Sequence, residues 1–140
     1  MNSKLRVCDR GTAADLAPVR VKFAVISIKN PPAPDVAFKD KNLVGVLRLA
    51  FDDIDVAEDD LVPFNDEMAG RVLDFVAEVW DKVDILLVHC NMGQCRSPAI
   101  AAAIARIQEG EDKFWFQTKT PNRSVYRRLL QLAHSRGLME

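Results

Sequence analysis

Cys90 and Arg96 are the residues of this chain whose types and spacing best suit chemistry. Gly93 lies between them, and a hydroxyl residue, Ser97, directly follows the arginine. A cysteine thiolate is a nucleophile, and the planar fork of an arginine binds two oxygens of a phosphate at once. This combination predicts a cradle for an oxyanion with a nucleophile beneath it.

The segment that carries these residues lies between two strongly apolar stretches. Residues 84–88 form a short apolar run that predicts a buried strand. Residues 98–108, rich in Ala and Ile, predict a buried helix, and Pro98 suits a first helical turn. A loop that enters a helix N-terminus directs backbone N–H groups at one point, where the helix dipole favours negative charge. A purely structural cysteine would not explain why Gly and polar residues interrupt two apolar segments.

Residues 89–97 match the signature His-Cys-x5-Arg-Ser/Thr, so the chain resembles the cysteine-dependent protein tyrosine phosphatases. The resemblance implies that Cys90 attacks phosphorus and forms a phosphocysteine intermediate, while Arg96 binds two phosphate oxygens. It also implies that Ser97 hydrogen-bonds the sulfur and helps it to leave. His89 would orient the loop from behind and help to keep the thiol ionised. The implied phosphate-binding amides belong to the P-loop: Asn91, Met92, Gly93, Gln94, Cys95 and Arg96.

A phosphatase also needs a proton donor for the leaving oxygen, and the family usually takes an aspartate from a mobile loop. Residues 47–51 alternate like a half-buried strand, and a cluster of acids follows them. In the dual-specificity branch the acid likewise follows a strand and precedes the helix that leads to the P-loop strand. That register favours Asp53 as the general acid, with Asp52 as the alternative. Because this loop is longer than is common in the branch, Asp59 and Asp60 also stay open.

A second cysteine before the arginine, Cys95, gives the loop a likeness to the low-molecular-weight tyrosine phosphatases. That family carries its loop near the chain start and takes its acid from an Asp-Pro pair, and this sequence has neither feature. The wider sequence is instead similar to small bacterial and phage-type predicted tyrosine phosphatases of the dual-specificity-like branch. Two hypotheses concern Cys95 itself: it captures an oxidised Cys90 as a reversible disulfide, or it fills space behind the loop.

Length and composition indicate an ordinary globular protein. The 140 residues suit a single phosphatase domain spanning residues 1–140. A formal net charge of -1 gives no reason to expect nucleic acid or a membrane as partner. Three cysteines, an odd number, do not suit a disulfide framework, and a free catalytic thiol favours the cytoplasm.

Alternating strands and helices predict an α/β fold. We expect a central, mostly parallel sheet of four to five strands flanked by helices on both faces, with the P-loop between the last strand and a buried helix. Residues 30–35, with three prolines, predict a rigid connecting loop. The expected strands are residues 4–8, 21–28, 44–51 and 84–88; the expected helices are a turn at 12–16 capped by Thr12, then 65–80, 98–108 and a last helix opened by Pro121 and Asn122.

The leading hypothesis is a phosphomonoester hydrolase that needs no metal and no cofactor, because Arg96 and the loop amides supply the positive charge that a metal supplies elsewhere. The expected substrate is a phosphorylated protein or a small aryl phosphate, since the loop has no basic residue besides Arg96 to meet further phosphates. One alternative is an arsenate reductase or rhodanese-like sulfurtransferase that uses the same cysteine. Another is a non-catalytic phosphate-binding module that has lost its acid.

Overall fold

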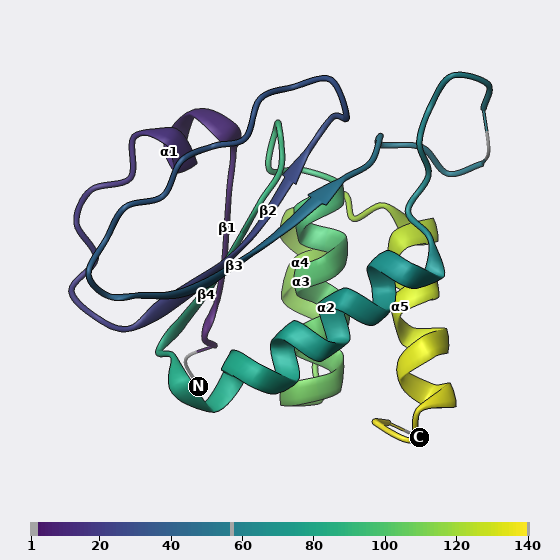
Figure 1. The fold of residues 1–140 in the computed structure, drawn as a ribbon. Helices are drawn as coiled ribbons and strands as arrows, with labels where there is room; N and C mark the ends of the chain where they lie inside the picture. Colours follow the sequence, from purple (N-terminus) through teal and green to yellow (C-terminus); the bar gives the residue numbers. More distant parts are fainter. Residues whose placement is uncertain (1–2, 57, 140) are drawn as a thin grey trace.

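A four-stranded parallel sheet forms the centre of the structure, a computed structural model that describes residues 3–56 and 58–139 (Figure 1). The strands, in their order across the sheet, are β1 (Leu5–Cys8), β4 (Ile85–His89), β2 (Phe23–Lys29) and β3 (Leu43–Ala50). Each pair of neighbours is parallel. The expected α/β fold with a mostly parallel sheet is therefore confirmed, with four strands in the described part of the chain.

The pairing register brings the carboxyl ends of the strands to one edge of the sheet. His89, the last residue of β4, lies beside Cys8 of β1 on one side and Ser27 of β2 on the other. The loops that follow the four strands therefore leave the sheet on the same side. This edge is where an open α/β sheet offers groups from several loops to one ligand.

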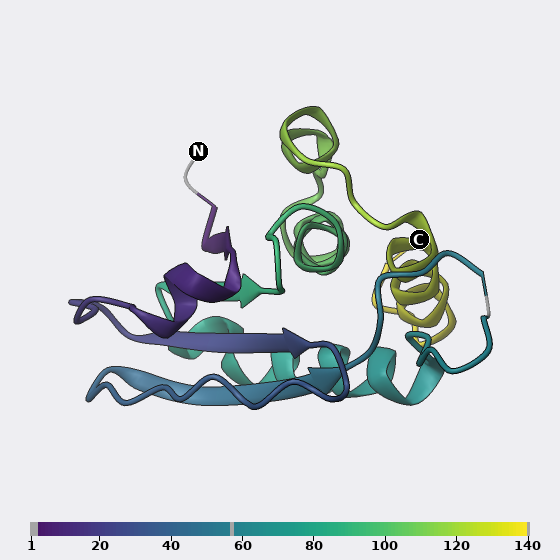
Figure 2. The ribbon, with the colours of Figure 1, turned by 90° about the horizontal axis from the view of Figure 1, so that it is seen from above.

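The helices that follow β3 in the chain lie on one side of the sheet (Figures 1 and 2). They are α2 (Asp66–Val79), extended by a short 3₁₀ turn (Trp80–Lys82), α3 (Arg96–Glu109), α4 (Lys113–Thr118) and α5 (Arg123–Ser135). Helix α2 packs on β3, α3 packs on β1 and β4, and α5 packs on α2 and α3. Ala24, Ile26 and Ile28 of β2 face these helices and are fully buried in the main core. None of the described helices is long and apolar enough to cross a membrane.

The opposite face is covered by loops and by one short helix, α1 (Arg10–Ala14). Phe23, Val25 and Leu87 face this side, where Val19 and Phe38 from two loops pack against them. Helices were expected on both faces, and among the described residues α1 is the only helix on this second face. The connection between β2 and β3 begins with three prolines, which cannot continue a helix.

Two helix starts differ from the expected ones. Helix α1 begins at Arg10 because the Asp9 carboxylate caps it, accepting from the Thr12 N–H at 2.7 Å, so Thr12 is not the cap. Helix α3 begins at Arg96, two residues before Pro98, because the P-loop turns directly into the helix. Helix α4 has no counterpart among the expected helices, since six residues are too few for a helical period to show.

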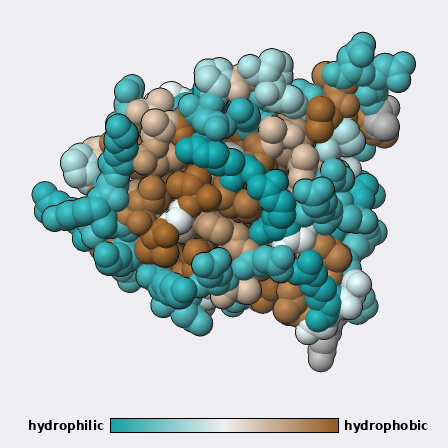
Figure 3. Space-filling view, viewed as in Figure 1, coloured by the Kyte–Doolittle hydropathy of each residue, from teal (hydrophilic) through white to brown (hydrophobic). Residues whose placement is uncertain are grey.

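Edge strand β3 presents apolar side chains to solvent. Figure 3 shows apolar side chains gathered on the face seen in Figure 1, and Val44 of β3 is 39% exposed. The main chain of this edge is partly covered, because Arg71 of α2 donates from Nη2 to the carbonyl of Arg48 at 2.9 Å. The Arg71 side chain thus occupies one main-chain acceptor with which another strand could pair.

Candidate active site

Cys90 is the first residue after β4, and its side chain is buried, with 2% exposed. Its Sγ lies 3.1 Å from Ser97 Oγ and accepts from the Gly93 N–H at 3.2 Å. The sulfur therefore lies at the N-terminus of α3, where the partial positive charge of the helix dipole faces it. Ser97 lies within hydrogen-bonding distance of the sulfur, as the resemblance implied.

The main chain of the P-loop, residues 90–96, turns its carbonyl groups outward. The carbonyls of Asn91, Gln94 and Cys95 accept from the N–H groups of Arg10 at 3.1 Å, Thr120 at 3.0 Å and Asn122 at 2.9 Å, respectively. In a planar trans peptide the following N–H points the opposite way to the carbonyl. The N–H groups of Met92, Cys95 and Arg96 therefore point into the loop, where an oxyanion would meet them.

Gly93 is required by the shape of this loop. Its φ is +71°, in the left-handed region that favours glycine. A Cβ atom here would also lie 3.0 Å from the Cys8 carbonyl carbon and 3.0 Å from the Asp9 nitrogen. The glycine inside the motif thus allows the loop to pass directly against the junction of β1 and α1.

Arg96, the first residue of α3, is a buried cation with 5% of its surface exposed. Its Nη1 donates to Asn30 Oδ1 at 2.6 Å and to the Phe51 carbonyl at 2.8 Å. Both bonds use Nη1, so the fork formed by Nη2 and Nε is not used by either. Among the residues described, no carboxylate forms an ion pair with Arg96. Because a buried charge without a counter-charge is costly, this arrangement favours an anionic ligand.

His89 is fully buried behind the loop. Its Nε2 lies 2.7 Å from Ser27 Oγ, its Nδ1 lies 3.4 Å from the Cys90 carbonyl oxygen, and the Phe38 ring packs against it. Burial lowers the pKa of His89, so the imidazole is neutral near pH 7. These contacts suit the orienting role that the resemblance implied. A neutral ring brings no positive charge to the thiol, so the implied ionising role has no support here.

Asp53 is held next to the P-loop by Asn122. Asn122 Nδ2 donates to Asp53 Oδ1 at 2.8 Å and to the Ile54 carbonyl at 3.1 Å. The same residue caps α5, accepting from the Val125 N–H at 3.1 Å, and its own N–H binds the Cys95 carbonyl. One residue therefore contacts both the P-loop and the loop that carries the acids, residues 52–62, which we call the acid loop.

The other candidate acids are placed differently. Asp52 closes the base of the acid loop, since its Oδ2 accepts from the Val62 N–H at 2.8 Å and its own N–H donates to the Val62 carbonyl at 2.7 Å. Asp59 and Asp60 are exposed and lie in the turn in which the Leu61 N–H binds the Glu58 carbonyl. The geometry thus brings Asp53 to the P-loop and gives Asp52 a contact within its own loop.

All three cysteines are free thiols. Burial and the nearby Asp53 carboxylate raise the pKa of Cys95. Burial, Asp9 and Cys90 raise the pKa of Cys8 to about 11. Both side chains are therefore protonated near neutral pH. Sequence reasoning did not place Cys8 near the site, because this position depends on β1 lying beside β4 in the sheet.

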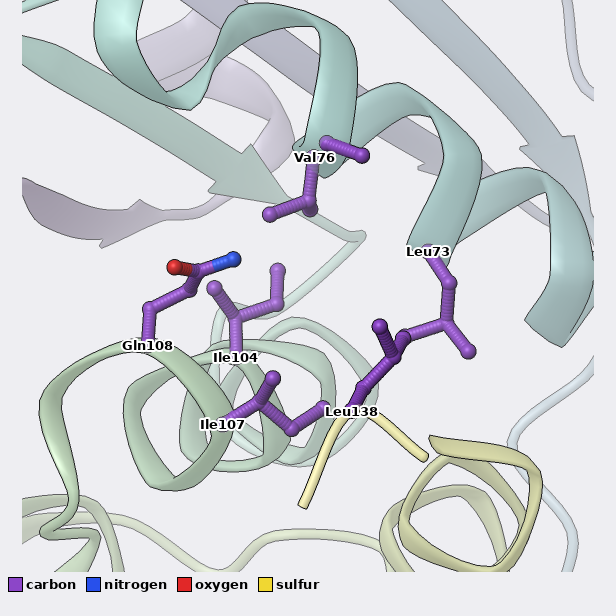
Figure 4. A pocket seen from close by; sticks show the side chains of 7 residues that line it. Leu73, Val76, Ile104, Ile107, Gln108 and Leu138 are labelled. Carbon is purple, nitrogen blue, oxygen red and sulfur yellow. The ribbon is translucent and has the colours of Figure 1, made fainter. Parts of the chain in front are cut away.

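Two hollows lie away from the P-loop. One, of about 130 Å³, lies between α2, α3 and the residues after α5, and its lining includes Leu73, Val76, Ile104, Ile107, Gln108 and Leu138 (Figure 4). The other, of about 630 Å³, is a groove between β1, α3 and α4 whose wall includes Trp115 and the exposed Phe114. Neither contains a P-loop residue.

Comparison with protein-family models and with curated proteins finds no match. The fold is nevertheless similar to solved structures. Human DUSP28 matches with a TM-score of 0.65 at 16% identity, over 97% of this chain and 95% of that one. DUSP15 matches with a TM-score of 0.65 at 20% identity, over 96% and 87%. Human tyrosine phosphatase-like serine/threonine/tyrosine-interacting protein matches with a TM-score of 0.58 at 20% identity, over 84% and 80%. At these identities the likeness establishes the fold, which is that of the tyrosine and dual-specificity phosphatases.

Proposed function

We propose that this protein is a cysteine-dependent phosphomonoester hydrolase of the dual-specificity type. The observation that carries the proposal is the buried Arg96, which has no carboxylate partner among the described residues and lies at a loop with inward N–H groups and a buried thiol. A tetrahedral dianion fits these groups, because it supplies both the missing negative charge and acceptors for the loop amides.

In the first step the Cys90 thiolate attacks phosphorus, and the bond from phosphorus to the ester oxygen breaks. The Arg96 fork and the P-loop amides bind the charge that develops on the equatorial oxygens. Asp53, as the carboxylic acid, gives its proton to the leaving oxygen, which departs as an alcohol or phenol. The product of this step is a phosphocysteine with Asp53 as the carboxylate.

In the second step the Asp53 carboxylate takes a proton from water, and the water oxygen attacks phosphorus. The bond from phosphorus to sulfur breaks, and the Ser97 hydroxyl stabilises the departing thiolate from 3.1 Å. Inorganic phosphate leaves, and Cys90 and Asp53 return to their starting states. The first nucleophile, the proton donor and the groups that bind the phosphoryl oxygens all come from the chain itself, and water supplies the second nucleophile.

The substrate class that we propose is a phosphorylated protein or a small aryl phosphate. The exposed side chains of the P-loop are Asn91, Met92 and Gln94, and none of them is cationic. Met92, 71% exposed, offers an apolar surface rather than a site for a second phosphate. The three free thiols fit a reducing compartment such as the cytoplasm.

The test is hydrolysis of p-nitrophenyl phosphate by the purified protein and by Cys90→Ser between about pH 5 and 8. We expect turnover by the wild type, none by Cys90→Ser, inhibition by vanadate and no effect of EDTA. Cys8→Ser is the matched control, because it makes the same change in a thiol outside the P-loop and should keep turnover.

Two other results would overturn the proposal. Binding of phosphate without hydrolysis of any phosphate ester would make the protein a binding module. Arsenate-dependent oxidation of thioredoxin, or sulfur transfer to cyanide, without ester hydrolysis would assign Cys90 to reductase or sulfurtransferase chemistry instead.

A further inference from the structure

We propose that Asn30 is a positioning residue for Arg96, and that its side-chain oxygen decides which edge of the guanidinium faces the P-loop. The inference rests on the proposed function only in assuming that Arg96 binds an oxyanion. It gives a role to the proline-rich connection after β2, which the sequence predicts to be a rigid connecting loop.

The bonding of the guanidinium supports this role. The group has five N–H donors, two of them on Nη1. Those two are matched by two acceptors, Asn30 Oδ1 at 2.6 Å and the Phe51 carbonyl at 2.8 Å. The acceptors come from the ends of β2 and β3, so they hold the guanidinium plane from two fixed points. The remaining three donors lie on Nη2 and Nε, the edge that can bind two oxygens of one phosphate.

The neutrality of Asn30 matters as much as its position. A carboxylate at this place would accept the same hydrogen bond but would also cancel the charge of Arg96. An amide oxygen orients the guanidinium and leaves its full positive charge for the ligand. The buried Arg96 is thereby ordered but not neutralised.

The loop that carries Asn30 is itself held by a turn of its own main chain and by bonds to α1 and to the end of β2. The Ala33 N–H binds the Asn30 carbonyl at 2.9 Å, and the Arg10 guanidinium donates to the Pro34 carbonyl. Asp35 forms an ion pair with Lys29 at 2.9 Å. Three of the residues between Asn30 and Asp35 are prolines, whose rings fix their own φ angles. A side chain on such a support loses little freedom when it binds Arg96.

The experiment compares Asn30→Ala, Asn30→Asp and a control, Asn42→Ala. Asn42 lies at the other end of the same connection, where its Nδ2 donates to the Val19 carbonyl at 2.7 Å, away from Arg96. Two quantities are measured: the dissociation constants of inorganic phosphate and tungstate by calorimetry, and the ¹⁵N NMR signals of the Arg96 Nη groups without any oxyanion. The second measurement reports whether the guanidinium is held still.

We expect Asn30→Ala to weaken the binding of both oxyanions about tenfold and to merge the separate Arg96 Nη signals of the wild type. Asn30→Asp should keep the separate signals, because it keeps the acceptor, yet bind phosphate more weakly because of its charge. Asn42→Ala should match the wild type in both measurements. This pattern separates a role in orienting Arg96 from a role in folding the connection.

The proposal is overturned if Asn30→Ala binds both oxyanions within about twofold of the wild type and keeps the separate signals. If Asn30→Ala does not fold, a folded Asn30→Asp that has lost the separate signals overturns it equally. Failure of the proposed function would give a different result. The wild type would then show no turnover, but its separate Arg96 signals would still be present and would still be lost in Asn30→Ala. The positioning role would stand in that case.

Discussion

The side-chain nitrogen of Asn122 lies 2.8 Å from Oδ1 of Asp53. Asn122 is only 7% exposed, whereas Asp53 is exposed, so the bond lies at the boundary between the core and solvent. Its main-chain N–H binds the Cys95 carbonyl at 2.9 Å, and the side chain therefore sets the distance between the acid loop and the P-loop. Loss of the amide should affect proton donation more than phosphate binding.

Asn122→Ser tests this contact. Serine is a good helix cap and can still accept from the Val125 N–H, but its hydroxyl is too short to reach Asp53. We expect kcat/KM to fall about tenfold for aryl phosphates with poor leaving groups and to change little for p-nitrophenyl phosphate. The measurement is kcat/KM across a series of aryl phosphates with graded phenol pKa values.

Asn65→Ser is the matched control for that series. Asn65 caps α2 in the same way, accepting from the Met68 N–H at 2.9 Å, whereas the amide bonded to Asp53 is that of Asn122. Its leaving-group dependence should equal that of the wild type. An equal fall in kcat/KM for every ester in Asn122→Ser would show that Asn122 serves only to stabilise the fold.

Asp53→Ala and Asp52→Ala should separate the two neighbouring acids. We expect Asp53→Ala to lose the basic limb of the pH–rate profile and about 100-fold in kcat with phosphotyrosine. Asp52→Ala should keep the profile and lower the free energy of unfolding by about 1 kcal/mol, since it removes the acceptor of the Val62 N–H. Loss of the basic limb in Asp52→Ala instead would identify Asp52 as the general acid.

Gly93→Ala should lower the free energy of unfolding more than Gly110→Ala does, although both glycines have positive φ, +71° and +77°. A Cβ on Gly110 would have open space, and we expect a loss of about 1 kcal/mol from backbone strain alone. A Cβ on Gly93 would also press on the Cys8 and Asp9 backbone, so the loop must shift. Urea unfolding and phosphate binding check this; equal losses of stability with intact binding would contradict the close approach.

His89 should make the stability depend on pH. Burial lowers its pKa below the ordinary 6.5, so the unfolded chain takes up a proton at a higher pH than the folded protein does. The stability that the neutral, buried His89 contributes is fully present above about pH 6.5, and it is lost as the pH falls from there toward the pKa of His89 in the folded protein. Urea unfolding at about pH 7.5 and 5.5 should show a larger loss in the wild type than in His89→Gln. Equal losses would mean that the folded protein admits the protonated ring.

Cys95→Ser decides between the two hypotheses for Cys95. The raised pKa of Cys95 leaves little thiolate to capture an oxidised Cys90, which favours the space-filling hypothesis. If Cys95 only fills space, Cys95→Ser should behave like the wild type. We expect the same fraction of activity to return on dithiothreitol treatment after mild peroxide exposure. Recovery that disappears in Cys95→Ser, but persists in Cys8→Ser, would establish the disulfide.

The sequence predicts the strands and the P-loop well because their signals are local. Cys90, Gly93 and Arg96 lie within one short segment, and the apolar runs around it allow little besides a buried strand and a buried helix. The same holds for the helix beginning after Asn122, where a cap residue follows a proline. These features depend on neighbours in the chain rather than on distant contacts.

The partners of Arg96 could not be predicted in this way. Asn30 reaches Arg96 only because β2 is adjacent to β4 in the sheet, a matter of strand order that no local pattern encodes. The Phe51 acceptor is a main-chain carbonyl, which every residue possesses, so its use leaves no trace in the sequence. Likewise the bond from Asn122 to Asp53 joins residues 69 positions apart.

The outward carbonyls of the P-loop bind main-chain N–H groups from both ends of the chain, Arg10 near the start and Thr120 and Asn122 near the end. The loop shape that we propose to bind an oxyanion therefore exists only while both of these segments are docked, and the unfolded chain lacks it. Ligand at 100 times its dissociation constant would then stabilise the whole fold by about 2.7 kcal/mol. In the cell, a protein of this design would be most resistant to unfolding and proteolysis when phosphate or substrate is abundant.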